Sequence, residues 1–274
     1  MNGTNAQFVS LTCHGNAILR GLMTNQFFPS NSSCQFCDRV NFIEISKTFF
    51  GKSKETEVAD TPDKWFAYLK KTGVHGLRLN TSPRNDPNLS DRMSAGFVGG
   101  GEVWGIEAVY ANGQSSYWQS RWEVWNKNAP DQRIWRVTYG RVAELKSSSV
   151  NTIGLAPIRN EFQDALQEIH DFALRNNCGG FTECFAKGLA TLARTPGAQR
   201  GFHQDLAPQG SLSSDAIGIL DACQHAWIFG GMGSWNDMGF DGEEGKLYDR
   251  VSERLFRTLN QAISVAANDS YPIG

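Results

Sequence analysis

Histidine and carboxylate side chains in the second half of the chain are the residues best suited to acid–base chemistry. His203 and Asp205 lie two positions apart in a stretch that also contains glycine and proline, and Asp237 lies in a second glycine-containing stretch. An imidazole exchanges a proton near neutral pH, and a neighbouring carboxylate can orient it. We therefore predict His203, Asp205 and Asp237 as candidate catalytic residues.

The segment 230–239 has the composition of a tight loop that contacts a ligand. It combines glycines with Trp235, Asn236 and Asp237. An aromatic plane and an amide can hold a small polar molecule, so Trp235 and Asn236 are predicted ligand-binding residues. The glycines follow a predicted helix, whereas a phosphate-binding loop needs them before a helix N-terminus. The alternative is structural, a helix stop in which Trp235 is a hydrophobic plug.

Two sets of residues resemble incomplete metal sites: Cys13, Cys34 and Cys37, and His203, Asp205 and His225. The first contains the C-x-x-C spacing of a zinc knuckle or a redox pair, but no second matching pair accompanies it. The second follows the order of a two-histidine, one-carboxylate iron site. Buried thiols and packed histidines are the alternative for both sets, and we assign no metal.

Charge and composition exclude several functional classes. The chain has 274 residues, with 26 Lys and Arg against 28 Asp and Glu, which gives a formal net charge of −2. Without a cationic excess we expect no nucleic-acid partner and no binding to anionic membranes. No run approaches the roughly 20 apolar residues of a membrane span, and the start lacks the pattern of a secretory signal, so a soluble, cytoplasmic protein is predicted. The common hydrolase, zinc-protease and nucleotide-binding motifs are absent from the expected contexts.

The apolar pattern changes from a period of two to a helical period near residue 150. We therefore predict a mainly β segment with one helix over 1–150 and a helical segment over 151–274. Strands are expected at 8–13, 40–45 and 77–79, followed by an antiparallel meander of three strands within 104–139. Asn112-Gly113 predicts a type I′ turn in the meander, and 50–60 reads as an exposed loop. The one helix of this half spans Pro62–Thr72, with Thr61 as its N-cap and Gly73 as its stop.

The second half predicts four helices, each with one apolar stripe. The first follows Pro157 and has an apolar residue at each of these positions: Ile158, Phe162, Ala165, Leu166, Ile169, Phe172 and Ala173. The others are expected over 181–192, ending before Pro196-Gly197, from about 213 to 227, and over 247–263.

These elements predict an α+β fold in which the C-terminal helices pack against an N-terminal, mainly antiparallel sheet. We expect those helices to cover the aromatic face of the sheet and to leave a crevice at the seam, within one shared globular unit. A small polar or aromatic molecule binding there, with possible acid–base catalysis, is the leading functional hypothesis. A noncatalytic protein-interaction module and a metalloprotein are the alternatives.

Overall fold

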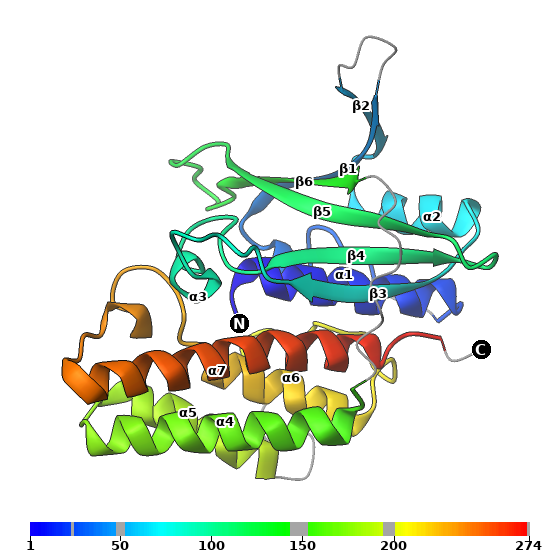
Figure 1. The fold of residues 1–274 in the computed structure, drawn as a ribbon. Helices are drawn as coiled ribbons and strands as arrows, with labels where there is room; N and C mark the ends of the chain where they lie inside the picture. Colours follow the sequence, from blue (N-terminus) through cyan, green and yellow to red (C-terminus); the bar gives the residue numbers. More distant parts are fainter. Residues whose placement is uncertain (23–24, 48–52, 143–152, 194–200, 273–274) are drawn as a thin grey trace.

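A computed structural model describes residues 1–22, 25–47, 53–142, 153–193 and 201–272, and confirms the α+β class (Figure 1). The helices are α1 (Gly3–Leu19), the 3-10 turn η1 (Ser32–Cys34), α2 (Pro62–Lys71), α3 (Asp91–Ser94), α4 (Leu155–Arg175), α5 (Gly180–Ala193), α6 (Ser214–Ala226), the 3-10 turn η2 (Trp235–Asp237) and α7 (Gly242–Asn268). The strands are β1 (Cys37–Lys47), β2 (Ser53–Ala59), β3 (Val74–Ser82), β4 (Val103–Tyr110), β5 (Ser115–Val124) and β6 (Trp135–Val142). No described helix combines the length and apolar character needed to cross a membrane.

The sheet has six strands in the order β2-β1-β6-β5-β4-β3, and β1 and β6 form its one parallel pair among the described strands. The meander β4-β5-β6 is confirmed. The type I′ turn is wrong, because only Gly113 has a positive φ, at 79°. The Gly113 amide donates to the Tyr110 carbonyl at 2.9 Å, and the Tyr110 amide donates to the Gln114 carbonyl at 2.8 Å. The connection is therefore a three-residue hairpin loop with glycine in the left-handed position.

The predicted strand at 8–13 is wrong, since these residues lie in helix α1. The short alternation of Val9, Leu11 and Cys13 fits a strand, but α1 is buried on nearly all sides, including the polar Gln7 and Asn16. A helix buried all round has no amphipathic stripe to reveal it. Its start is nevertheless encoded locally, because the Asn2 side chain accepts a hydrogen bond from the Asn5 amide at 2.9 Å.

The predicted loop at 50–60 is also wrong where the structure describes it, because Ser53–Ala59 is strand β2. This strand forms the edge of the sheet and pairs only with β1, and its first five residues are exposed. Charged, exposed residues are common on edge strands, where they discourage further pairing. Its strand conformation therefore depends on the partner β1 and not on its own apolar pattern.

The remaining helices agree with their local signals. In α2, the Thr61 side chain accepts a hydrogen bond from the Lys64 amide, Pro62 opens the helix, and Gly73 follows it with φ 81°. Helix α4 buries all seven of the apolar positions predicted for it. Helices α5, α6 and α7 confirm the other three predictions. The predicted boundary at 150 and the Pro196-Gly197 stop lie outside the described residues.

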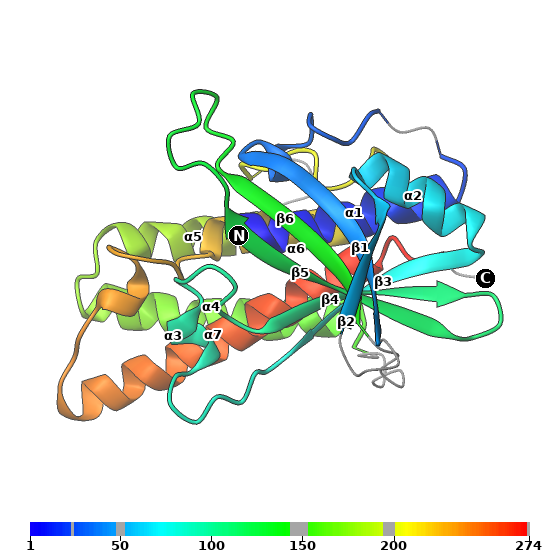
Figure 2. The same ribbon diagram turned by 90° about the horizontal axis from the view of Figure 1, so that it is seen from above.

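The aromatic face of the sheet is covered by α1 and α2, which lie on the same side of it (Figure 2), and not by the C-terminal helices as predicted. Phe42 stacks on Trp65 of α2 with ring centres 4.4 Å apart. Phe8 of α1 meets Tyr139 edge to face at 5.4 Å. The N-terminal half thus fills its own aromatic layer, and the C-terminal helices reach the sheet elsewhere.

Helix α7 meets the sheet at the free edge of β3, where side-chain amides replace a further strand. Asn268 accepts a hydrogen bond from the Leu79 amide at 2.6 Å and donates to its carbonyl at 2.9 Å. Asn16 of α1 does the same for Leu77, at 2.6 and 2.9 Å. These two asparagines satisfy edge groups that would otherwise pair with another strand. Helices α4, α5 and α6 then gather with α7 below the sheet (Figure 1).

Candidate functional site

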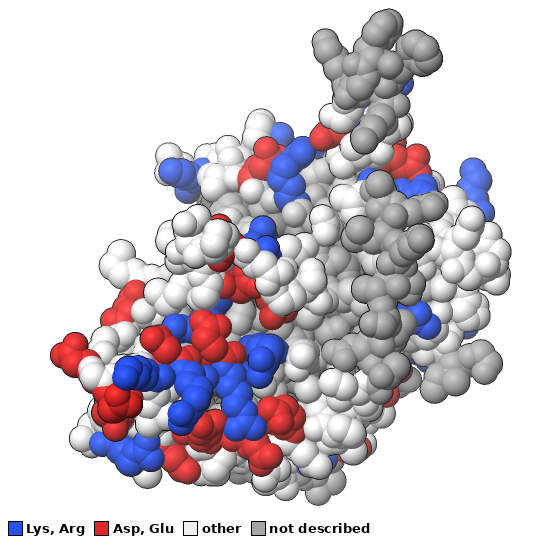
Figure 3. Space-filling view, viewed as in Figure 1, with Lys and Arg blue, Asp and Glu red and all other residues white. Residues whose placement is uncertain are grey.

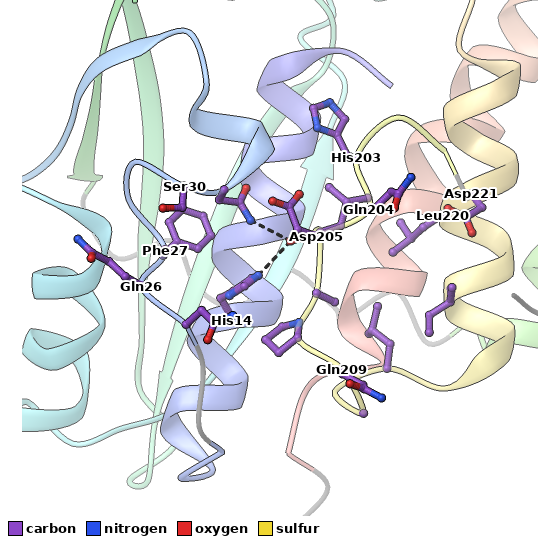
Figure 4. A pocket seen from close by; sticks show the side chains of 18 residues that line it. His14, Gln26, Phe27, Ser30, His203, Gln204, Asp205, Gln209, Leu220 and Asp221 are labelled. Atoms are coloured by element: carbon purple, nitrogen blue, oxygen red, sulfur yellow. Dashed lines mark hydrogen bonds between the residues drawn. The ribbon is translucent and has the colours of Figure 1, made fainter. Parts of the chain in front are cut away.

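A cavity of about 820 Å³ opens between the N-terminal half and the C-terminal helices. Its walls come from α1, from segment 25–31, from segment 201–212 and from α6 (Figure 4). Both His203 and Asp205 line it. A crevice is therefore present at the seam, although it lies beside α1 and not beneath the aromatic face of the sheet.

Asp205 fastens segment 201–212 to the N-terminal half. Its carbonyl oxygen accepts hydrogen bonds from Asn31 Nδ2 at 2.8 Å and from His14 Nε2 at 3.1 Å (Figure 4). Its carboxylate accepts one from the Ser32 amide at 2.8 Å and another from the Ser32 hydroxyl. Because Ser32 engages both carboxylate oxygens, Asp205 holds the wall of the cavity in place.

The same contacts set the protonation of His203. Its Nδ1 lies 2.8 Å from the Ser32 hydroxyl oxygen. If that hydroxyl donates its proton to Asp205, its oxygen can only accept from His203, so Nδ1 carries the hydrogen and Nε2 keeps a lone pair. Nε2 has no hydrogen-bond partner among the residues that the structure describes. Burial lowers the pKa of His203, which favours this neutral imidazole.

His14 presents a second neutral imidazole. A backbone carbonyl can only accept, so the contact with Asp205 requires the hydrogen on Nε2 of His14. Its Nδ1 is then an acceptor, and this buried atom has no partner in the described part of the chain. Burial is the main cause that lowers the pKa of His14. The ring lies edge to face against Phe27, 4.9 Å between centres.

The charged groups of the cavity are acidic. Asp205 and Asp221 line it, and no lysine or arginine occurs among its described lining residues. Asp221 Oδ1 accepts a hydrogen bond from the Gly201 amide at 3.0 Å. Without a cation in the wall, a phosphate or carboxylate ligand would have no counter-charge, whereas an uncharged or cationic molecule would be accepted.

The residues predicted in segment 230–239 do not line this cavity. Trp235 is fully buried in the helical half, with its ring 5.3 Å from that of Phe185 and 5.4 Å from that of Tyr248. Its indole nitrogen donates to the Ser252 hydroxyl at 2.7 Å. The contacts of Trp235 are those of a hydrophobic plug, the structural alternative to a ligand-binding role.

Asn236 and Asp237 are also engaged within the fold. Asn236 accepts a hydrogen bond from Arg92 Nη1 at 3.1 Å and donates to the Arg92 carbonyl at 2.9 Å. Asp237 is exposed, and its carboxylate accepts from the Gly233 amide. The structure therefore brings His203 and Asp205 together and leaves the other three candidates outside their cavity.

Neither predicted metal set converges. Cys34 and Cys37 both lie 3.6 Å from Gln7 Nε2, whereas the Cys13 thiol donates to the Ala267 carbonyl at 3.8 Å. Burial raises the pKa of Cys37 to about 11 and that of Cys13 to about 12, so these thiols stay protonated. Within the described residues, no group of three or more His, Cys, Asp or Glu side chains is placed to hold a metal ion. His225 does not line the cavity of His203.

Sequence reasoning missed the residues that complete this cavity, above all Ser32, Asn31 and the role of His14. One local signal was present, because Asn31 is the N-cap of η1 and accepts a hydrogen bond from the Ser33 amide at 3.0 Å. No local signal connects these residues to Asp205, which is 173 positions from Ser32.

No protein-family model, curated protein or solved structure matches this chain. The interpretation of the cavity therefore depends on its chemistry alone.

Proposed function

We propose that this protein binds a small polar molecule, uncharged or cationic, in the cavity between α1 and segment 201–212. One observation carries the proposal: a cavity of about 820 Å³ that combines two neutral imidazoles with acidic groups and has no cation among its described lining residues. This volume lies within the roughly 300–1,000 Å³ of small-molecule sites.

The lining offers both affinity and orientation. Apolar side chains of Leu206, Leu212 and Leu220 form part of the wall. Polar groups also line the cavity, including the exposed side-chain amides of Gln204 and Gln209. Apolar contact with a few convergent polar groups is the usual composition of a ligand pocket.

His203 is the proposed acid–base group of this site. The chain of hydrogen bonds from Asp205 through Ser32 to Nδ1 leaves the Nε2 lone pair available to accept a proton. Asp205 and Ser32 are positioning residues for this base, since Asp205 holds the Ser32 hydroxyl and that hydroxyl holds the imidazole and its tautomer. A bound hydroxyl or ammonium group is the proton donor that suits such a base.

Crystallographic fragment screening tests the proposal even though the identity of the ligand is open. The library should contain equal numbers of anionic fragments and of neutral or amine fragments. We expect hits in the cavity, drawn mainly from the neutral and amine half. The Ser30→Trp variant should lose them, because Ser30 lies exposed on the rim and a large side chain there would occupy the cavity.

The control is Asp237→Asn, which lies outside the cavity and should keep the same hits. A screen in which no fragment occupies the cavity, or in which anionic fragments dominate, would contradict the proposal.

A second candidate, a noncatalytic protein-interaction role, is favoured by exposed apolar side chains on two adjoining loops. Phe97 is 70% exposed and Met232 is fully exposed. The loops approach so closely that a Cβ on Gly96 would clash with the Gly230 carbonyl. If this patch carries the function, a Phe97→Ser, Met232→Ser double variant should lose a protein partner that the wild type retains, and should keep the fragment hits.

A further inference from the structure

A second cavity, of about 440 Å³, lies between the connection from β3 to β4 and helix α7. The side of the connection supplies Pro83, Asp91 and Glu102, and α7 supplies Phe256 and three arginines at positions 250, 254 and 257. Figure 3 shows lysine and arginine side chains gathered along α7 among carboxylates. The three arginines recur at helical spacing, so they share one face of α7.

Most charges around this cavity are already paired. Arg254 contacts Glu168 at 2.8 Å and Glu161 at 3.1 Å. Arg250 is 3.7 Å from Glu168. On the opposite wall, Asp91 accepts a hydrogen bond from the Arg84 amide at 3.0 Å. Each of these groups has an internal partner and needs no ligand.

Glu253 is likewise occupied, because it accepts hydrogen bonds from Arg92 at 3.0 Å and from the Ser90 hydroxyl at 2.9 Å. Arg257 differs from these groups. It is exposed and makes no ion pair or hydrogen bond among the residues that the structure describes. The guanidinium of Arg257 is therefore available to contact a ligand.

Glu102 is the buried carboxylate of the same cavity, and it is only 8% exposed. One of its oxygens accepts a hydrogen bond from the Thr81 hydroxyl. No ion pair joins it to Arg257 or to any other cation in the described part of the chain. Burial is the main cause that raises the pKa of this carboxyl. The charge of Arg257 acts in the opposite direction and lowers this pKa, but the two side chains form no ion pair. A cationic group from a ligand would add the direct contact that this buried carboxylate lacks.

The side chain of Asn260 is an incompletely satisfied group next to Glu102. It lies beside Glu102 and is fully buried, yet neither its nitrogen nor its oxygen has a well-formed hydrogen bond among the described residues. Buried amides are normally satisfied, and exceptions call for an explanation such as an absent ligand or water. A buried amide next to the cavity-lining Glu102 is thus incompletely satisfied.

We propose that this second cavity binds an α-amino acid or a closely similar zwitterion. Arg257 would pair with the carboxylate of the ligand, and Glu102 would pair with its ammonium group. The two protein charges face one cavity without pairing with each other, which is the arrangement that a ligand carrying both opposite charges would complete. The apolar surface of Phe256 and Pro83 is available to the side chain of the ligand. This proposal is independent of the cavity of His203.

Binding of single amino acids to the whole protein tests this proposal. Each proteinogenic L-amino acid should be titrated separately, by calorimetry or ligand-observed NMR. We expect at least one to bind with a Kd of about 1 mM or lower. The tightest ligand should then be compared with the carboxylic acid that lacks its amine and with the amine that lacks its carboxylate. Each analogue should bind at least about tenfold more weakly, since each loses one charge-assisted contact.

Two variants locate the site. Arg257→Gln changes an exposed side chain and should weaken binding about tenfold or more without affecting folding. Glu102→Gln keeps the shape of the side chain and should weaken binding of the amino acid while leaving that of the carboxylic acid analogue unchanged. Lys246→Gln is the matched control, because it removes one cation from α7 outside the cavity and should leave binding unchanged.

Three results would overturn the proposal. They are the absence of binding by any amino acid, equal binding of the amino acid and its carboxylic acid analogue, and unchanged binding by Arg257→Gln. None of them bears on the fragment hits expected in the cavity of His203, so the two proposals fail separately.

Discussion

The two segments that flank α6 have similar compositions and different structural roles. Segment 201–212 precedes the helix and segment 230–239 follows it, and both combine glycines with side chains able to bind a ligand. In the first, His203 and Asp205 line a cavity. In the second, Trp235 and Asn236 bind other parts of the protein itself.

The difference lies in where the hydrogen-bonding groups find partners. The Trp235 indole, the Trp235 carbonyl and the Asn236 amide are all satisfied by other residues of the fold, the carbonyl by the Tyr248 hydroxyl at 2.5 Å. In the first segment, Nε2 of His203 has no such partner among the described residues. A polar loop becomes a candidate site when its groups stay unsatisfied around a cavity, and composition alone does not distinguish the two cases.

The largest effect should come from Trp235→Ala. Removing a fully buried indole from the helical half leaves a cavity, so we expect the free energy of unfolding to fall by about 3–5 kcal/mol. Urea denaturation measures this change. Fragments should still occupy the cavity of His203 under conditions where the variant is folded. A near-neutral effect on stability would mean that segment 230–239 is not a structural plug.

Asn236→Ala should have the next largest effect. It removes both hydrogen bonds to Arg92, whose side chain is only 4% exposed, so a loss of about 1–3 kcal/mol in unfolding free energy is expected. The comparison variant is Asp237→Asn, at an exposed neighbouring position, which should change stability by less than about 0.5 kcal/mol. Equal effects of the two substitutions would show that the contact with Arg92 does not stabilise this segment.

Ser32→Ala should cost less in stability but should change the chemistry of the first segment. We expect a loss of about 1 kcal/mol, because the hydroxyl that joins His203 to Asp205 is removed. In the wild type, nitrogen NMR should find the hydrogen of neutral His203 on Nδ1. In the variant the Nε2–H tautomer should increase. If the wild type already has its hydrogen on Nε2, the proposed hydrogen-bond chain is incorrect.

The smallest effect should be a dependence of stability on pH that comes from the first segment. Burial lowers the pKa of His203 below its ordinary 6.5 in the folded protein. As pH falls below 6.5, the unfolded chain therefore takes up the proton first and unfolding is favoured. This contribution to stability is complete above 6.5 and is lost as pH falls through the lowered pKa.

His203→Gln should consequently lose less stability than the wild type between about pH 7.5 and about pH 5.5. Asp237→Asn should follow the wild type over the same range. Parallel stability curves for the wild type and His203→Gln would contradict the assignment of a buried, neutral His203.

Helices with one apolar face could be predicted from sequence because their pattern is local. Helix α4 buries the seven positions that its spacing indicated, and α2 begins at Thr61 and Pro62 as their chemistry requires. Helix α1 and strand β2 could not be predicted in this way. The first is surrounded by protein, so it has no polar face, and the second is held only by the backbone of β1.

The candidate site was predictable only in part for the same reason. His203 and Asp205 were identifiable as acid–base types, but Ser32, His14 and Asn31 approach them from positions far along the chain. Hydrogen bonds between residues more than 170 positions apart leave no spacing to detect.

The sequence by itself determined the α+β class, the meander, the amphipathic helices and the net charge close to zero, because each follows from neighbouring residues or from composition. The tertiary structure decided which helices cover the aromatic face, which of two similar loops lines a cavity, and which charges remain without a partner. These outcomes depend on long-range packing and on the satisfaction of buried polar groups, and both are settled only when distant segments meet.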